Sequence, residues 1–534
     1  MRILSDLYGP TRSPVLAQRG VVATSQPLAV QAGIEMLRRG GNAVDAAIAT
    51  AITLTVVEPT SNGIGGDAFA LVWDGNKLYG LNGSGRAPEA LTLHAVKAAG
   101  HETMPSRGWM PVTVPGAPAA WRDLHKRFGK LRFEELFEPA IFYAERGHPV
   151  APIVAQHWGS AAQAYAQLTS PEFAGWPKTF TLNGRAPQAG EIWASPDHAR
   201  TLRRLAESYC EDFYRGKLAQ EIVRFAQETG GFFSERDLAE HTSTWVEPIK
   251  TSYRDYDVWE IPPNTQGLVA LLGLNILEGF ELTRHPRDSA ESFHVQIEAL
   301  KLAFADGLRY IADPDFVAVP TEKLLSKEYA AVRRTLITDR ALDPAPGDPY
   351  AGGTVYLCAA DSDGMMVSFI QSNYMGFGSG IVVPGTGIAL HNRGACFALD
   401  PQHPNSLAPR KRPYHTIIPG FLTRAHKAIG PFGVMGGFMQ PQGHIQVIVN
   451  TVDYAMNPQA SLDAPRWQWV KAKEIEIESD TDLKIIEGLR ARGHAVKLVE
   501  PGGRFGRGQI IWRLPSGTYI AGSDKRADGY AAGI

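Results

Sequence analysis

The segment from Gly352 to Gly380, GGTVYLCAADSDGMMVSFIQSNYMGFGSG, decides how the chain is interpreted. Two short strands are predicted, at Val355 to Ala360 and Met365 to Ile370, because each is a short apolar run next to turn residues. Between them, Asp361 to Gly364 (DSDG) has the composition of a tight turn. The two strands should therefore pair as a hairpin.

A threonine, Thr354, opens the first of these strands, directly after Gly352 and Gly353 at the end of a Pro/Gly/Asp-rich segment, Asp343 to Gly353. If the peptide bond between Gly353 and Thr354 is cut, the threonine gains a free α-amine beside its own hydroxyl. The amine can then act as base for the hydroxyl, which is the N-terminal-threonine form of nucleophilic catalysis. Taken alone, however, the pattern is more often an ordinary loop-to-strand junction.

Composition narrows the class of protein. The 534 residues are 44% hydrophobic and 20% charged, as in a globular protein with a large core, and the net charge of −2 gives no case for binding nucleic acid or an anionic membrane. Three cysteines without a CxxC pair, Cys210, Cys358 and Cys396, indicate neither a disulfide framework nor a zinc site. No apolar run predicts a signal peptide or a membrane span, so we expect a cytoplasmic protein.

Helices and a hairpin are expected in the first part of the chain. Ser25 to Arg39 predicts a helix with Ser25 as its N-cap and a Gly-Gly stop after it. Asn42 should cap a second helix, which is apolar nearly all round and therefore buried. Ala68 to Trp73 and Lys77 to Leu81 predict a hairpin around an Asp-Gly-Asn turn.

The middle of the chain, from about residue 115 to 340, is predicted to be mostly helical, with Ser289 to Tyr310 as its clearest helix. The last third is rich in predicted strands, including Ile381 to Asn392. Gly433 to Asp453 contains a glycine pair before a predicted helix, and backbone N–H groups at such a turn can stabilise an oxyanion. This order of elements favours an α+β fold with sheets between layers of helices.

Two ligand sites are considered and disfavoured. Gly63, Gly65 and Gly66 resemble a phosphate-binding loop but precede a strand rather than a helix. His294, Glu298 and Asp306 lie on one predicted helix without the HExxH spacing of a zinc site, so surface or core roles are favoured. We therefore expect no metal and no organic cofactor.

Several blocks, in order along nearly the whole chain, resemble the γ-glutamyltransferase-like family of N-terminal-nucleophile hydrolases. They are GGNAVDAAIATA, VVEPTSNGIGGDAFALVWDG, VPGAPAAW (114–121), EALKLAFADGLRYIADPDF (298–316), TVYLCAADSDG, FGSGIVV, LHNRGACF, APRKRP (408–413), GGF, NPQASLDAPRW (457–467) and SDKRADGYAAG (523–533). The resemblance implies a four-layer αββα sandwich, made as one precursor that its own threonine cleaves.

Matched onto this family, Thr354 is the nucleophile and the bond from Gly353 to Thr354 is the cleavage site. The resemblance then implies a large fragment, 1–353, that stays associated with a small fragment, 354–534, as one αββα domain. The sequence leaves open whether such pairs form a dimer.

The resemblance also assigns the remaining site residues. Gly436 and Gly437 match the oxyanion glycine pair, and Ser372 matches a second hydroxyl residue that holds the nucleophile's amine. His415 and Thr416 occupy the place of a serine pair that contacts the substrate carboxylate.

The chain departs from the γ-glutamyl-transferring members at the substrate site. Arg393 stands at a glutamine position, Cys396 at an acidic position that grips the substrate α-amino group, and Tyr374 at an asparagine position. The arginine that binds the α-carboxylate in those members aligns with Ser84, and Arg86 lies two places further on. The site has thus lost a carboxylate and gained a guanidinium, which disfavours an α-ammonium group and favours an acyl group that carries a carboxylate.

The runs NRGxxF and KRPxHTIIP also resemble an acylase-type subgroup that includes oxamate amidohydrolase and cephalosporin-acylase-like proteins. We therefore expect hydrolysis of a small anionic amide, with oxamate favoured and Arg393, Arg86, Tyr374, His415 and Thr416 around the substrate. The alternatives are a γ-glutamyl hydrolase or transferase acting on glutathione-like substrates, a cephalosporin or glutaryl-amide acylase, and an unprocessed binding protein with a vestigial site.

Overall fold

The computed structural model describes residues 11–344 and 353–534. Gly352 and most of the Pro/Gly/Asp-rich segment before Thr354 lie outside the described residues, as do residues 1–10. Gly353 and Thr354 themselves are described and belong to a strand.

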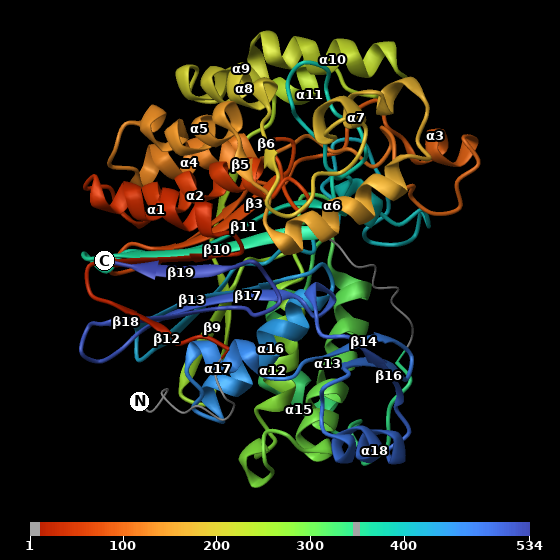
Figure 1. Ribbon diagram of the computed structural model, residues 1–534. Helices are drawn as coiled ribbons and strands as arrows, with labels where there is room; N and C mark the ends of the chain where they lie inside the picture. Colours follow the sequence, from red (N-terminus) through yellow and green to blue (C-terminus); the bar gives the residue numbers. More distant parts are fainter. Residues whose placement is uncertain (1–10, 345–352) are drawn as a thin grey trace.

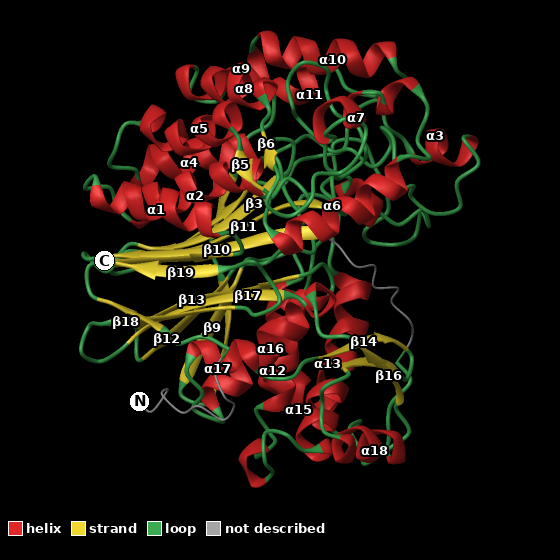
Figure 2. Cartoon of the chain, in the orientation of Figure 1, coloured by secondary structure: helices red, strands yellow, loops and turns green. Residues whose placement is uncertain are grey.

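Two antiparallel sheets pack face to face, and helices cover the outer face of each sheet (Figures 1 and 2). Helices α1, α2, α4 and α5 lie on one side of this sandwich, and α12, α13 and α16 lie on the other. Apolar side chains of the two inner faces, among them Phe69, Tyr356, Phe421 and Ile511, form one core cluster between the sheets. The predicted order of layers, helices then two sheets then helices, is confirmed.

The strands group into sheets that mix early and late parts of the chain. One sheet has the order β1 (Val15–Ala17), β18 (Tyr519–Ser523), β17 (Arg507–Arg513), β13 (Lys427–Met435), β12 (Gly420–Arg424), β9 (Tyr256–Glu260), β8 (Ile249–Tyr253). The other has the order β19 (Tyr530–Gly533), β2 (Gly20–Thr24), β10 (Gly353–Asp361), β11 (Met366–Tyr374), β3 (Asp67–Trp73), β4 (Leu78–Asn82), β7 (Thr244–Val246). The smaller sheets are β14 (Trp467–Lys471), β15 (Glu474–Glu478), β16 (Ala495–Val499), and β5 (His148–Pro149), β6 (Ile192–Trp193).

Helices before the hairpin segment are α1 (Pro27–Arg38), α2 (Ala43–Val57), α3 (Leu93–Ala98), α4 (Ala117–Phe128), α5 (Glu138–Arg146), α6 (Pro152–Tyr165), α7 (Gly175–Phe180), α8 (Pro196–Glu207), α9 (Glu211–Arg215), α10 (Lys217–Glu228), α11 (Glu235–Ala239), α12 (Gly267–Leu277), α13 (Ala290–Tyr310), α14 (Thr321–Leu324) and α15 (Lys327–Arg334). After it come α16 (Met439–Val452), α17 (Pro458–Asp463) and α18 (Leu483–Ala491).

The predicted hairpin is confirmed as β10 and β11, in the middle of the second sheet. Strand β11 runs four residues beyond the predicted end and reaches Tyr374. The pairing shifts register between Gly353 and Val355, where Thr354 lies opposite two residues of β11, Ser372 and Asn373, as at a β-bulge of β11. A bulge redirects a side chain at a strand end, and bulges are frequent beside active sites.

Other predicted elements are also confirmed. Asn42 caps α2 through a capping box with Asp45, and every residue of α2 is buried. Ser289 caps α13, and the glycine pair Gly436–Gly437 lies just before α16. The early hairpin is β3 and β4.

Two expectations were wrong, and a third stretch holds more than the sequence predicts. The N-cap of α1 is Gln26, because the Ser25 hydroxyl instead donates a hydrogen bond to the buried Glu58 carboxylate. The stretch 115–340 is mostly helical, as expected, and also contains β7, β8 and β9, whose short alternating patterns are stabilised by long-range pairing with β4 and β12. Residues 381–392 form isolated bridges rather than a strand, because Gly385 and Gly387 adopt positive φ and turn the chain back on itself.

Within 11–344 and 353–534, none of the helices combines enough length with enough apolar character to cross a membrane.

Candidate active site

Thr354 is buried, and its hydroxyl faces a second hydroxyl. Its Oγ1 atom lies 3.0 Å from Ser372 Oγ, which is hydrogen-bond distance. Ser372 lies near the end of β11, and its Oγ also accepts a hydrogen bond from the backbone N–H of Tyr374 at 2.8 Å. The hairpin thus brings together the two hydroxyl residues that the sequence predicts.

Arg393 lies beside this hydroxyl pair. It opens the short 3-10 helix Arg393–Cys396 and is fully buried. Its Nη2 donates to Ser372 Oγ at 3.3 Å and its Nη1 donates to Thr416 Oγ1 at 2.6 Å. The guanidinium carbon also lies 4.4 Å from the ring centroid of Tyr374. Arg393 is therefore two hydrogen-bond steps from Thr354 Oγ1.

The Arg393 guanidinium makes no ion pair with a carboxylate in the described part of the chain, and its Nε has no hydrogen-bond partner there. A buried cation ordinarily needs a carboxylate or several strong acceptors, because losing its hydration costs several kcal/mol. Two hydroxyl groups and the Cys396 thiol are weak direct partners, and the nearby Asp67 carboxylate acts on Arg393 only through its charge, without an ion-pair contact. The guanidinium therefore retains the capacity to bind an anion beside Thr354.

The glycine pair has the backbone that its expected role requires. Gly436 has φ of +141° and Gly437 has φ of +61°, values that L side chains rarely adopt. Among the described residues, neither backbone N–H of the pair has an acceptor, whereas both carbonyls accept hydrogen bonds from the first turn of α16. The Gln266 side-chain amide links the glycine pair to Thr416, because its Nε2 donates to the backbone carbonyls of both Gly437 and Thr416.

Asp67 forms the centre of a buried polar cluster next to Arg393. Its Oδ2 accepts a hydrogen bond from His415 Nε2 at 2.9 Å and lies 3.6 Å from His391 Nδ1. Burial alone would raise the pKa of Asp67, but His391, His415 and Arg393 outweigh burial and lower the pKa to about 2. The carboxylate is therefore ionised at neutral pH and offsets the charge of Arg393.

His415 is held neutral in this cluster. Burial, together with repulsion from Arg393, lowers its pKa to about 3, although the hydrogen bond to Asp67 opposes that shift. Its ring is committed to Asp67. Of the expected pair, Thr416 contacts Arg393 directly, whereas the His415 ring contacts Asp67.

Of the other residues that the sequence places around the substrate, Arg86 lies away from Thr354. Arg86 is partly exposed, and its guanidinium forms an ion pair with Asp315 at 2.7 Å. No described contact joins it to the Thr354 cluster. Ser84, which aligns with the family arginine, donates its hydroxyl to Asn82. Cys396 lies near Arg393 and Tyr374, and burial raises the pKa of its thiol.

The profile of the gamma-glutamyltranspeptidase family matches residues 29–534, most of the chain. The chain belongs to this family. It is a self-processing amidohydrolase of the N-terminal-nucleophile type, with the fold of that family.

Similar proteins in the family have different printed activities. The chain is 37% identical to the glutathione hydrolase-like YwrD proenzyme of Bacillus subtilis, over 97% of this chain and 99% of the relative. It is 34% identical to the oxamate amidohydrolase proenzyme of Klebsiella pneumoniae, with 97% and 99% covered. The crystal structure of a cephalosporin acylase from Bacillus halodurans matches with a TM-score of 0.95 and 56% identity, covering 99% of this chain and 98% of that one.

Sequence reasoning missed three residues of this family member's site: Asp67, His391 and Gln266. Asp67 lies inside the block GIGGDAF and His391 inside LHNRG, but neither was singled out. A buried strand that begins on an acid is a usable signal, because a buried carboxylate needs partners. Gln266 has no such signal, since its role is to bridge two backbone carbonyls.

The expected helix residues His294 and Glu298 meet His494 at distances that could suit a metal ion. However, Lys301 Nζ lies 2.8 Å from Glu298 Oε1, and an ammonium group there opposes binding of a cation. His294 Nε2 bonds to the carbonyl of Thr338, and Glu298 accepts from Leu342 N–H. These contacts hold Thr338 and Leu342 against α13. Asp306 lies apart from this cluster and pairs with Arg333 at 3.0 Å.

Proposed function

We propose that Thr354 is the nucleophile of an amidohydrolase whose substrate is a small amide with a carboxylate on its acyl group. The observation that carries this proposal is the buried Arg393 guanidinium, which forms no ion pair with a carboxylate of residues 11–344 or 353–534 and lies two hydrogen-bond steps from Thr354 Oγ1. A substrate carboxylate would supply the missing bidentate acceptor, and such charge-assisted pairs are the strongest hydrogen bonds in proteins.

Maturation would begin with attack of Thr354 Oγ on the Gly353 carbonyl, which forms an ester that water hydrolyses. The products would be the fragments 1–353 and 354–534, which stay together because each large sheet contains hydrogen-bonded strands of both fragments. The new α-amine of Thr354 would then lie beside its own hydroxyl.

In turnover, the α-amine would accept the Oγ proton, directly or through one water, as Oγ attacks the amide carbonyl. The N–H groups of Gly436 and Gly437 would stabilise the oxyanion, worth roughly 3–4 kcal/mol per donor. The proton would pass to the departing nitrogen, which leaves as ammonia or an amine. Water would then hydrolyse the acyl ester and release the acid.

The closeness of Arg393 to the nucleophile favours a short acyl group. Thr354 and Arg393 share a hydrogen-bond partner, Ser372, so the anion site and the attacked carbon are near each other. In oxamate the carboxylate is bonded directly to the amide carbon, and an attacking oxygen sits roughly 3 Å from that carbon. Oxamate is therefore the preferred substrate.

A cephalosporin or glutaryl-type acylase is the second candidate, supported by 56% identity to the Bacillus halodurans acylase. Its substrate class would also place a carboxylate on Arg393. A γ-glutamyl substrate is disfavoured because its α-ammonium group would need a free carboxylate. Asp67 is already saturated by His415 and by the backbone N–H groups of Gly85 and Gly116.

Intact mass of the wild type and of Thr354→Ala tests the nucleophile. We expect two wild-type fragments, the smaller beginning at Thr354, and one whole chain in the variant. Ammonia release from oxamate, against product release from a glutaryl amide and a γ-glutamyl anilide, then ranks the substrates. A wild-type chain that stays whole would refute the mechanism, and preferred turnover of the γ-glutamyl anilide would refute the substrate class.

A further inference from the structure

A pocket of about 540 Å³ opens at the far end of the sandwich from Thr354. Strand β3 links the two places, because Asp67 pairs with Ser372 at one end and Trp73 pairs with Met366 at the other. Six residues of extended strand span roughly 20 Å. The pocket is therefore separate from the active site.

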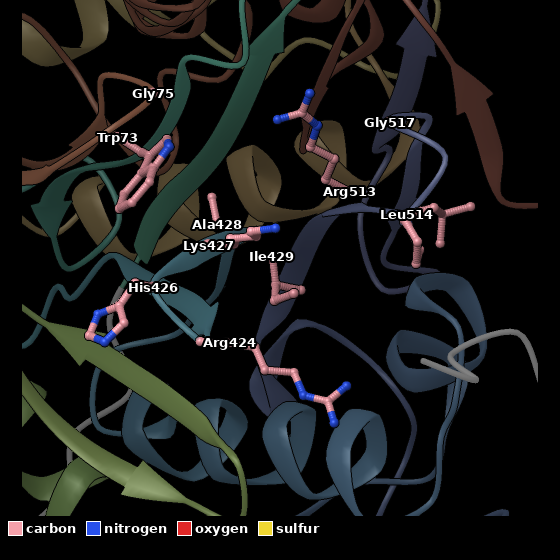
Figure 3. A pocket seen from close by; sticks show the side chains of 12 residues that line it. Trp73, Gly75, Arg424, His426, Lys427, Ala428, Ile429, Arg513, Leu514 and Gly517 are labelled. Carbon is pink, nitrogen blue, oxygen red and sulfur yellow. The ribbon is translucent and has the colours of Figure 1, made fainter.

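Three hairpins from different parts of the chain build this pocket (Figure 3): the β3–β4, β12–β13 and β17–β18 turns. Trp73, Ile429 and Leu514 contribute apolar surface, so most of the lining is carbon. The volume lies within the roughly 300–1,000 Å³ that is typical of small-molecule sites.

The charges at the pocket are all basic, and two have no ion partner. Arg424 pairs with Asp255 and stacks over Tyr256. Lys427 and Arg513 are exposed and form no ion pair with any described residue, although Arg513 lies over the Tyr519 ring. His426 belongs to the same lining. Among the described residues no acidic side chain lines the pocket, so the charges that face it directly are positive.

We propose that this pocket binds an organic carboxylate with an apolar body, such as a medium-chain alkyl acid. The apolar body would lie against Trp73, Ile429 and Leu514. The carboxylate would face Lys427 and Arg513, which supply the charge-assisted hydrogen bonds that an anion needs. The site is distinct from catalysis, and it stands whether or not Thr354 has the role proposed above.

Calorimetric titration of the processed protein with octanoate tests the site. We expect saturable binding of one octanoate per chain, at least tenfold weaker binding in Lys427→Ala/Arg513→Ala, and at least tenfold weaker binding of octan-1-ol to the wild type. The control Arg19→Ala/Lys484→Ala removes two exposed cations elsewhere and should bind within twofold of the wild type. Thr354→Ala should also bind normally, which separates this site from the active site.

Leu514→Asp offers a second variant, because it places a like charge beside the ligand at a partly exposed position and should abolish binding. Equal affinity of the two double variants, or equal affinity for octanoate and octan-1-ol, would overturn the proposal. So would a wild-type dimer that dissociates in Lys427→Ala/Arg513→Ala without any octanoate binding, since the pocket would then be an interface between copies.

Discussion

Two buried arginines in this protein, Arg526 and Arg393, have opposite surroundings. Arg526 donates through Nε and Nη2 to the Glu478 carboxylate, and through Nη1 to Asp524 Oδ1 at 3.1 Å. Its remaining N–H groups donate to the carbonyls of Leu462 and Ala464. Arg393 has two hydroxyl acceptors and no ion pair in the described part of the chain.

The difference separates structure from function. A saturated buried arginine has no hydrogen-bonding capacity left for a ligand, so its charge serves only to hold the small fragment's core together. An unsaturated one imposes a desolvation cost that a substrate carboxylate can repay. A buried charge beside a candidate nucleophile therefore indicates a binding role only when few hydrogen-bond and ion-pair partners in the protein already contact it.

Arg526→Met should produce the largest change. It leaves Glu478 and Asp524 buried with reduced compensation, so we expect about 3–5 kcal/mol less stability. Urea unfolding of the processed protein measures the loss. Activity per folded molecule should stay near the wild-type value, and a variant as stable as the wild type would break the contrast between the two arginines.

Arg393→Gln should act on catalysis instead. Loss of the anion partner should cost about 2–4 kcal/mol of transition-state stabilisation for oxamate, which lowers kcat/KM roughly 30- to 700-fold. Stability should fall less than in Arg526→Met, because no directly paired carboxylate is stranded. Steady-state ammonia release measures the effect, and a neutral amide of the same size is the control substrate. Equal losses for both substrates would contradict a carboxylate-binding role.

Thr416→Val sharpens the comparison by removing one of the two acceptors of Arg393. A hydrogen bond to a charged group is worth about 1.5–3 kcal/mol, so the transition state for oxamate hydrolysis should lose up to that amount of stabilisation and kcat/KM should fall accordingly. The valine side chain fills the same space as the threonine. The matched control is Thr423→Val, a buried threonine on β12 whose hydroxyl accepts from Trp259 instead. If the two variants lose oxamate turnover equally, Thr416 has no special part in orienting Arg393.

As the pH is lowered, the cluster around Arg393 and His415 should lose its contribution to stability before the Arg526 cluster does. The folded pKa of His415 is lowered to about 3, mainly by burial, from an unfolded value of about 6.5. Between these values the unfolded chain binds a proton that the folded chain does not, so this histidine's contribution to stability falls by about 1.4 kcal/mol per pH unit as pH decreases.

The Arg526 cluster should respond only below about pH 4, where unfolded carboxylates gain protons. Burial opposes ionisation of Asp524, but Arg466 and Arg526 outweigh burial and lower the pKa of Asp524. Unfolding free energies of the wild type and His415→Gln from pH 7 to 4.5 test the difference. Plotted against pH, the unfolding free energy of His415→Gln should have a slope smaller than that of the wild type by about 1.4 kcal/mol per pH unit, the contribution of one proton. Parallel curves would show that His415 is not held neutral.

The sequence by itself determined the local elements and the family. The hairpin around Asp361–Gly364, the Asn42 cap and the helix predicted at Ser289 to Tyr310 all depend on neighbouring residues, so their signals are complete within a short window. The ordered motif blocks likewise pointed to the family that the comparison with known proteins identifies. Arg393 was recognised as a change of charge at one motif position.

Tertiary structure decided what each charged group does. Asp67 is more than 300 residues away from His391 and His415 in the chain, and the roles of all three follow from burial and mutual distances that no local pattern encodes. The contrast between Arg393 and Arg526 is likewise invisible in the sequence, because the number of acceptors around a guanidinium depends on which backbone carbonyls and carboxylates the fold brings to it. Arg86, equally suitable by sequence, lies at the surface beside Asp315 for the same reason.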